Sequence, residues 1–124
     1  MKEVVAMIRM NKINATKKAL LDAGISSCNV RECLGRGKGL VDFNLLKGAE
    51  RGYEEAIAQL GSSQRLVPKR MISIVVPSKQ KNIVVQTIIN ANRTDKPGDG
   101  KIFVMPLSQA IRIRTGEEGE TALE

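Results

Sequence analysis

The segment Met71-Ile72-Ser73-Ile74-Val75-Val76, residues 71–76, decides the fold of this chain. It is apolar at both alternating sets of positions and ends at Pro77, as expected of a strand with apolar residues on both faces. Residues 4–8, Val-Val-Ala-Met-Ile, show the same pattern. A sheet with one face in water alternates apolar and polar residues instead. We therefore expect a sheet whose second face is covered by another subunit, so that the protein is an oligomer.

The segments around these two strands predict the rest of the fold. Residues 11–23 and the segment after Ser78 have helical periodicity, with Gly24 as a C-cap and Ser78 as an N-cap. The expected buried positions are Ile13, Leu20 and Leu21 in the first helix, and Ile83, Val84, Thr87, Ile88 and Ala91 in the second. Residues 28–34 and 102–107 are the other predicted strands. The order β-α-β-β-α-β predicts an α+β, ferredoxin-like fold, with both helices on one face of an antiparallel sheet.

Residues 40–66 interrupt this pattern between the two middle strands, because they have no strand character. Within them, residues 49–60 set an apolar face on a short helix between Gly48 and Gly61, made of Ala49, Tyr53, Ala56, Ile57 and Leu60. A long excursion bounded by glycines in a small domain is typical of a functional loop. A disordered, solvated loop is the other interpretation, and the residues leave both open.

Length and composition limit the possible functions. A chain of 124 residues is one domain, and without histidine it lacks the commonest general base and metal ligand. Cys28 and Cys33 would face opposite ways on a strand, so they cannot pair, and two free thiols suit a reducing cytoplasm. We expect neither a signal peptide nor a membrane span, because the N-terminus leads directly into strand-like sequence.

The charge of the chain predicts an anionic partner. The net charge is +7, but four glutamates are the only charges after Arg114, so residues 1–114 carry +11, from 20 basic and 9 acidic residues. Such an excess of positive charge suits nucleic acid or a small polyanion such as a nucleotide.

The segment from Thr94 to Val104 is a candidate polyphosphate site. Gly98 and Gly100 flank Asp99, and glycine lets backbone amides turn into one concavity that binds anions, with the charge of Lys101 beside it. Arg112 and Arg114 would project from the same face of an extended segment. An ordinary hairpin turn with solvated charges is the alternative. Gly35-Arg36-Gly37-Lys38-Gly39 is a second candidate anion loop, or else a hinge or plain turn.

Together these features resemble the PII family of nitrogen-regulatory signal proteins. The resemblance covers nearly the whole chain except residues 40–66, and it rests on the glycine turn, on residues 112–117 (Arg-Ile-Arg-Thr-Gly-Glu) and, less specifically, on residues 35–39. It implies a compact trimer that binds ATP or ADP between subunits and 2-oxoglutarate beside ATP through a bridging Mg²⁺. It also implies that the long loop between the second and third strands, the T-loop, docks onto a target.

The resemblance assigns roles residue by residue within a single domain, residues 1–124, with a T-loop at about 37–66 and a C-terminal tail at about 115–124. The implied nucleotide-binding residues are Asn29, Gly35, Gly37, Lys38, Val75, Gly98, Asp99, Gly100, Lys101, Arg112 and Arg114. The two arginines would reach the phosphates across the subunit boundary. The implied 2-oxoglutarate contacts are Gly37, Gly39 and Lys69. We expect Tyr53, Ile57 and Leu60 to dock onto the partner, and we expect no catalytic residue and no side-chain ligand for a metal.

The chain departs from the usual family pattern in three places. Residues 37–40, Gly-Lys-Gly-Leu, lack the glutamine that contacts magnesium and 2-oxoglutarate in the family. Ser73 replaces a glutamate, and Arg51 stands where many members carry a modified tyrosine, so we expect no uridylylation. The altered and lengthened loop resembles the nitrogen-fixation branch of the family, whose members act in pairs of related subunits on dinitrogenase.

The resulting hypothesis is a cytoplasmic regulator rather than an enzyme. It would form a homotrimer, or a hetero-oligomer with a sister subunit, sense ATP, ADP and 2-oxoglutarate, and control dinitrogenase by T-loop docking that 2-oxoglutarate plus ATP relieves. A general regulator of glutamine synthetase or an ammonium channel is the alternative within the family. From other classes, an RNA-binding module would need aromatics on its open sheet face, and a phosphohydrolase would need a general base. The chain offers Phe103 at most for the first and no histidine for the second.

Overall fold

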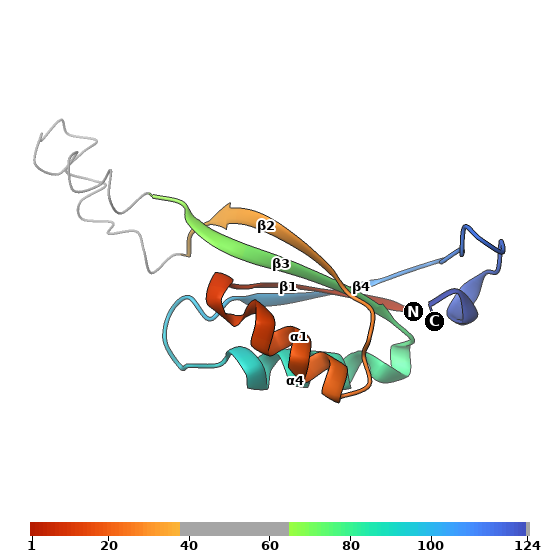
Figure 1. Ribbon diagram of the computed structural model, residues 1–124, viewed down its shortest axis with the longest axis horizontal. Coiled ribbons are helices and arrows are strands. Elements are labelled where there is room, and N and C mark those ends of the chain that lie inside the picture. The colour runs from red at the N-terminus through yellow and green to blue at the C-terminus, as the bar shows by residue number, and fades with distance from the viewer. Residues whose placement is uncertain (38–64, 124) are drawn as a thin grey trace, which may run out of the picture.

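The computed structural model of the chain describes residues 1–37 and 65–123. Its elements are β1 (Lys2–Arg9), α1 (Ile13–Asp22), β2 (Asn29–Gly35), β3 (Val67–Val76), α4 (Lys81–Asn92) and β4 (Lys101–Pro106), with 3₁₀ helices at Met10–Lys12, Ser78–Gln80 and Gly119–Leu123. The strands form one antiparallel sheet in the order β2-β3-β1-β4. Both helices lie on the same face of that sheet (Figure 1). The predicted α+β, ferredoxin-like fold is confirmed.

The core lies between the two central strands and the helices. Along β1 and β3 every second residue is buried, and these side chains meet one face of each helix. The buried apolar residues are Val4, Ala6 and Ile8 of β1, Ile72, Ile74 and Val76 of β3, Leu20 of α1, and Val84 and Ile88 of α4. Each large aliphatic side chain contributes about 1.5–3 kcal/mol by leaving water, so this cluster supplies most of the stabilisation of a chain with few aromatics.

The two helices differ in detail from the prediction because they pack against each other through polar residues. Thr16 of α1 and Asn92 of α4 are buried, and the Asn92 amide donates to the Thr16 hydroxyl at 2.9 Å. Leu21 and Ile83, both predicted to be buried, are more than half exposed. Ser78 does not cap α4, which begins at Lys81 after a 3₁₀ turn. Instead, the Ser78 hydroxyl accepts a hydrogen bond from the N-terminal ammonium group.

The face of the sheet away from the helices is mostly apolar. The register places Val5 between Ser73 on β3 and Phe103 on β4, and Met7 between Met71 and Lys101. Phe103 is 51% exposed and Met105 is 40% exposed. These side chains are exposed in the single chain, so the prediction that another subunit covers this face stays a prediction.

The described residues also include both cysteines and helices whose length can be compared with that of a membrane span. Cys28 and Cys33 are free thiols, as predicted. Among residues 1–37 and 65–123, no helix combines the length and the apolar character needed to cross a membrane.

Candidate functional site

The glycine turn joins α4 to β4 and lies against the end of β1. Gly98 and Gly100 have positive φ angles of 99° and 108°, which side chains with a Cβ rarely adopt. The turn also needs glycine for space, because a Cβ on Gly100 would overlap the carbonyl oxygen of Met7. The two glycines therefore fix a specific backbone shape, as the sequence pattern predicted.

The Asp99 carboxylate is bonded inside the turn. It accepts hydrogen bonds from the Thr94 hydroxyl, from the Thr94 amide at 2.8 Å and from the Asp95 amide at 3.1 Å. It also pairs with the Arg9 guanidinium at 2.6 Å. The hydroxyl and amide of Thr94, together with Arg9, lower the pKa of Asp99 well below its usual value, because they stabilise the charged form. The resemblance groups Asp99 with the nucleotide ligands, whereas its carboxylate here closes the turn.

A cavity of about 420 Å³ lies between this turn and the ends of β2 and β3. Its lining residues are Met7, Gly35, Arg36, Gly37, Lys69, Gly98, Gly100, Lys101 and Phe103. It thus brings together residues that the sequence assigned to nucleotide and effector from three separate segments. Within the described part of the chain, no carboxylate pairs with the ammonium group of Lys69 or Lys101. These two charges are therefore available to an anion in the cavity.

Sequence reasoning missed Arg9, which holds the turn, and also Met7 and Phe103 of this cavity, and it named Arg36 only as part of the second candidate anion loop. The register could have indicated Met7 and Phe103, because Met7 pairs with Lys101 and the β1–β4 register places Phe103 on the same open face. Arg36 follows Gly35 directly and belongs to the predicted anion loop, so its position in the sequence was a usable signal.

The other predicted residues lie toward the C-terminal segment. Asn29 begins β2 opposite Ser73, and Val75 lines a second cavity of about 530 Å³. That cavity is also lined by Ser26, Ser27, Glu120 and Thr121, among others. The Ser26-Ser27 pair carries no distinctive pattern in the sequence.

The prediction that Arg112 and Arg114 share one face of an extended segment is wrong. They lie in a turn in which the Gly116 amide donates to the Arg112 carbonyl at 2.7 Å, between Ile111 and Glu118, which form a β-bridge. Gly116 has a φ of 75°, which permits this reversal of the chain. Arg112 pairs with Glu117 at 3.3 Å and donates to the Thr121 carbonyl at 2.7 Å, whereas Arg114 is exposed.

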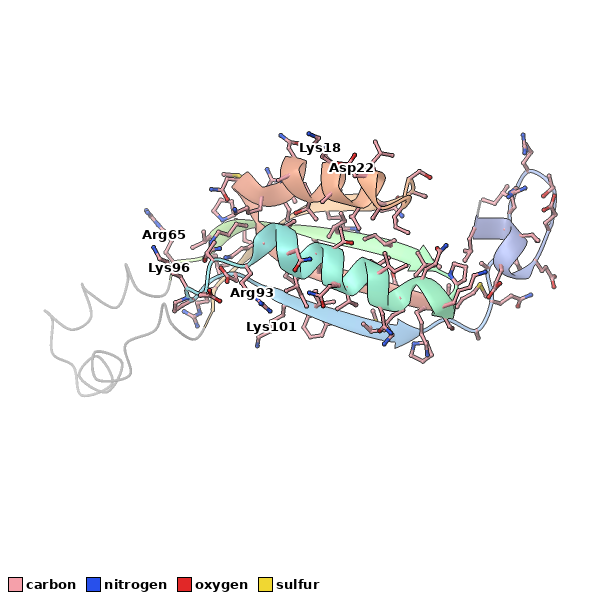
Figure 2. All side chains as sticks on the ribbon, turned by 90° about the horizontal axis from the view of Figure 1, so that it is seen from below. Lys18, Asp22, Arg65, Arg93, Lys96 and Lys101 are labelled. Carbon is pink, nitrogen blue, oxygen red and sulfur yellow. The ribbon has the colours of Figure 1, made fainter. Side chains whose placement is uncertain are left out.

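The predicted site is therefore divided between two ends of the molecule. The glycine turn, Gly35, Gly37 and Lys69 lie at one end of the sheet, and the C-terminal segment with Arg112 and Arg114 extends from the other (Figure 1). Figure 2 shows Arg65, Arg93 and Lys96 gathered at the end opposite the C-terminal segment. The predicted contacts Lys38, Gly39, Tyr53, Ile57 and Leu60 lie outside the described residues.

Comparisons with known proteins assign this chain to a family. The profile of the family described as "Nitrogen regulatory protein P-II" matches residues 1–117. The chain therefore belongs to the P-II family, whose members are regulatory signalling proteins.

Its relatives include "Nitrogen fixation nifHD region GlnB-like protein 2" of Methanobacterium ivanovii, 44% identical over 128 residues that cover 99% of each chain. The protein of the same description from Methanothermococcus thermolithotrophicus is 44% identical over 127 residues, covering 99% of this chain and 98% of the relative. These relatives place the chain in the nitrogen-fixation-associated branch of the family.

More general members of the family are also similar. "Nitrogen regulatory protein P-II" of Rhodobacter capsulatus is 41% identical over 123 residues, covering 99% of this chain and all of the relative. Among solved structures, PII of Arabidopsis thaliana bound to citrate superposes with a TM-score of 0.74 at 33% identity. The superposition covers 99% of this chain and 89% of that chain. That relative thus binds a polycarboxylate.

Proposed function

We propose that this protein is a cytoplasmic regulator that binds ATP or ADP and 2-oxoglutarate between the subunits of a trimer and controls dinitrogenase through its T-loop. The trimer consists of this chain alone or of this chain with a sister subunit. Nucleotide and 2-oxoglutarate set the position of the T-loop, since a ligand shifts an equilibrium only by binding the two states with different affinity. With ATP and 2-oxoglutarate bound, the loop is withdrawn from the target; with ADP it docks.

The observation that carries this proposal is the division of the site. Lys101 and the glycine turn lie at one end of the sheet, while Arg112 and Arg114 lie beyond the other. One chain therefore cannot bring both sets of cations to one phosphate group. A neighbouring copy can, and the uncovered apolar face with Phe103 provides a surface against which copies pack.

The cavity beside the glycine turn also suits 2-oxoglutarate. Lys69 and Lys101 line it together, so that one ammonium group is available to a carboxylate and the other to a phosphate. No cluster of potential metal ligands occurs in residues 1–37 and 65–123, and the Asp99 carboxylate is already bonded to Thr94 and Arg9. Mg²⁺ bound together with ATP and 2-oxoglutarate would neutralise part of their negative charge.

The open face of the sheet favours this function over RNA binding. RNA-binding modules of this topology stack bases on two or three aromatic side chains. Phe103 is the only aromatic residue in the described part of the chain, and the other two aromatics of the sequence, Phe43 and Tyr53, lie outside it. A nucleotide held by phosphate contacts requires no such platform.

Calorimetric titration of ATP with and without 2-oxoglutarate, in the presence of Mg²⁺, tests the sensing function. Positive coupling between the two ligands supports it, because neither an RNA-binding module nor a hydrolase predicts such coupling. Identical ATP isotherms in the two titrations would contradict it.

Capture by dinitrogenase tests the choice of target. Intact protein and a variant lacking residues 42–62 are offered to immobilised dinitrogenase with ADP, or with ATP and 2-oxoglutarate. We expect capture of the intact protein with ADP only, and no capture of the deleted form. The same assay is repeated with immobilised glutamine synthetase and an ammonium channel, and binding to one of these but not to dinitrogenase would indicate the general type of regulator. Equal capture of both forms would show that the loop is not the docking element.

A further inference from the structure

We propose that Arg9, which no sequence motif indicated, is a positioning residue of the nucleotide site. It fixes the glycine turn and cancels the negative charge that Asp99 places beside the phosphates. This inference rests on the proposed function, because it assumes that the turn binds phosphate.

The contacts of Arg9 join the end of β1 to the whole turn. One guanidinium nitrogen pairs with the Asp99 carboxylate at 2.6 Å and lies 3.5 Å from the Thr94 hydroxyl. The other donates to the Pro97 carbonyl at 3.1 Å. The guanidinium also packs against Gly98, because a Cβ on that glycine would lie 3.2 Å from it. A planar fork with several donors is suited to fixing a turn at several points at once, which a lysine cannot do.

Strand pairing and the ion pair place Arg9 and Asp99 beside the predicted site. Arg9 lies directly opposite Lys69 on β3, and it pairs at 2.6 Å with Asp99, which precedes the first residue of β4 by two positions. Side chains directly opposite on neighbouring strands lie on the same face and close together. The row Lys69, Arg9 and Asp99 thus runs from the proposed effector lysine to the proposed phosphate turn.

The charges in this row explain why an acidic residue is tolerated in a phosphate site. An unpaired carboxylate beside a bound phosphate would repel it. Arg9 compensates that charge, so Asp99 does not offset the positive charges of Arg36, Lys69 and Lys101, which line the cavity. The Arg9–Asp99 pair is three-quarters buried at both side chains, so it is less screened than a surface pair.

A double-variant cycle on the intact protein tests this role, with ATP affinity measured by calorimetry. Arg9→Ala should weaken ATP binding by about tenfold or more, because it frees the Asp99 charge and loosens the turn. Asp99→Asn in the Arg9→Ala background should then recover about threefold or more of the affinity, because asparagine keeps an acceptor for Thr94 but carries no charge. Asp99→Asn alone should change the affinity by less than about threefold. Arg9→Lys should fall between wild type and Arg9→Ala.

The outcomes separate this inference from the proposed function. If the doubly substituted protein binds ATP no better than Arg9→Ala, Arg9 does not act by compensating Asp99. Wild-type affinity in Arg9→Ala, with weakened binding in Lys101→Ala, would overturn the inference and leave the phosphate turn in place. Wild-type affinity in both would remove the turn from the nucleotide site. A loss of about tenfold in Asp99→Asn alone would make Asp99 a direct ligand and contradict its proposed role.

Arg93→Ala is the matched control for loss of a positive charge near the turn. Arg93 is exposed at the same end of the molecule (Figure 2), and its side chain makes no hydrogen bond or ion pair with the described residues. We expect it to bind ATP within about threefold of wild type. If Arg93→Ala weakens ATP binding as much as Arg9→Ala, then loss of any positive charge near the turn weakens binding. Arg9 would have no specific role, and the inference would fail.

Discussion

Gly100 lies so close to β1 that a Cβ atom on it would overlap the carbonyl oxygen of Met7. The obstacle is backbone rather than a flexible side chain, so it cannot move aside without breaking the pairing of β1 with β4. The glycine that marks the candidate phosphate turn in the sequence is thus required for the fold.

Gly100→Ala should therefore destabilise the protein by about 2 kcal/mol or more, from overlap and from strain at a φ of 108°. Denaturant titration measures this change. Gly37→Ala is the control, because no atom of residues 1–37 and 65–123 lies within 4 Å of a Cβ at Gly37 and its φ is not positive. Equal midpoints for wild type and Gly100→Ala would show that the turn does not approach β1 as described.

The stability contributed by Asp99 should depend on pH in a defined direction. Its pKa is lowered in the folded state, so its ionised form stabilises the fold above its usual pKa of about 4, and this contribution is lost as the pH falls below that value. The difference in unfolding free energy between wild type and Asp99→Asn should be constant from about pH 5 to 8 and shrink below about pH 4. Urea titrations across this range measure it.

Asp95→Asn provides the comparison for that series, because none of the described residues donates a hydrogen bond to the Asp95 carboxylate. A difference between wild type and Asp99→Asn that persists unchanged at pH 3 would contradict the hydrogen-bonded, charged state of Asp99.

Lys69→Ala should abolish the 2-oxoglutarate response while leaving ADP binding nearly intact. Lys69 lines the same cavity as Lys101 but lies on a different strand, β3. Its charge can therefore be removed without altering the glycine turn. Calorimetric titration of ATP with 2-oxoglutarate, and of ADP alone, separates the two effects. A variant that still shows coupling between ATP and 2-oxoglutarate would move the effector site elsewhere.

Lys101→Ala and Arg114→Ala should each weaken ATP binding by about tenfold or more, because a charge-assisted contact is worth about 1.5–3 kcal/mol. Both side chains are exposed in the single chain, so the circular dichroism spectra should be unchanged. Near-wild-type affinity in both variants would place the nucleotide elsewhere.

The sequence was sufficient for the fold because its apolar pattern is simple. Short apolar strands such as β1 and β3, separated by periodic helices, leave little choice of topology, and the order of elements was predicted correctly. The prediction of which helix residues are buried was less accurate. Periodicity alone could not show that Thr16 and Asn92 would pair between the helices and leave Ile83 exposed.

The candidate site was predicted in part for a related reason. Glycines with positive φ and neighbouring lysines leave a local signal, so the turn and the residues near Lys69 were found. Arg9 left none, because its partner Asp99 is 90 residues away in the sequence and meets it only through strand pairing. The error at Arg112 and Arg114 came from treating a segment that ends in Gly116 as extended.

The central claim is that each nucleotide site takes Lys101 from one subunit and Arg114 from its neighbour. Mixed trimers of Lys101→Ala and Arg114→Ala chains, co-expressed in equal amounts and titrated with ATP by calorimetry, test it most directly. If the site is shared, about one quarter of the interfaces in the mixture combine an intact Lys101 with an intact Arg114 and bind ATP with wild-type affinity. If both residues act within one chain, every chain in the mixture lacks one of them. No site of wild-type affinity would then appear, and that result would contradict the account.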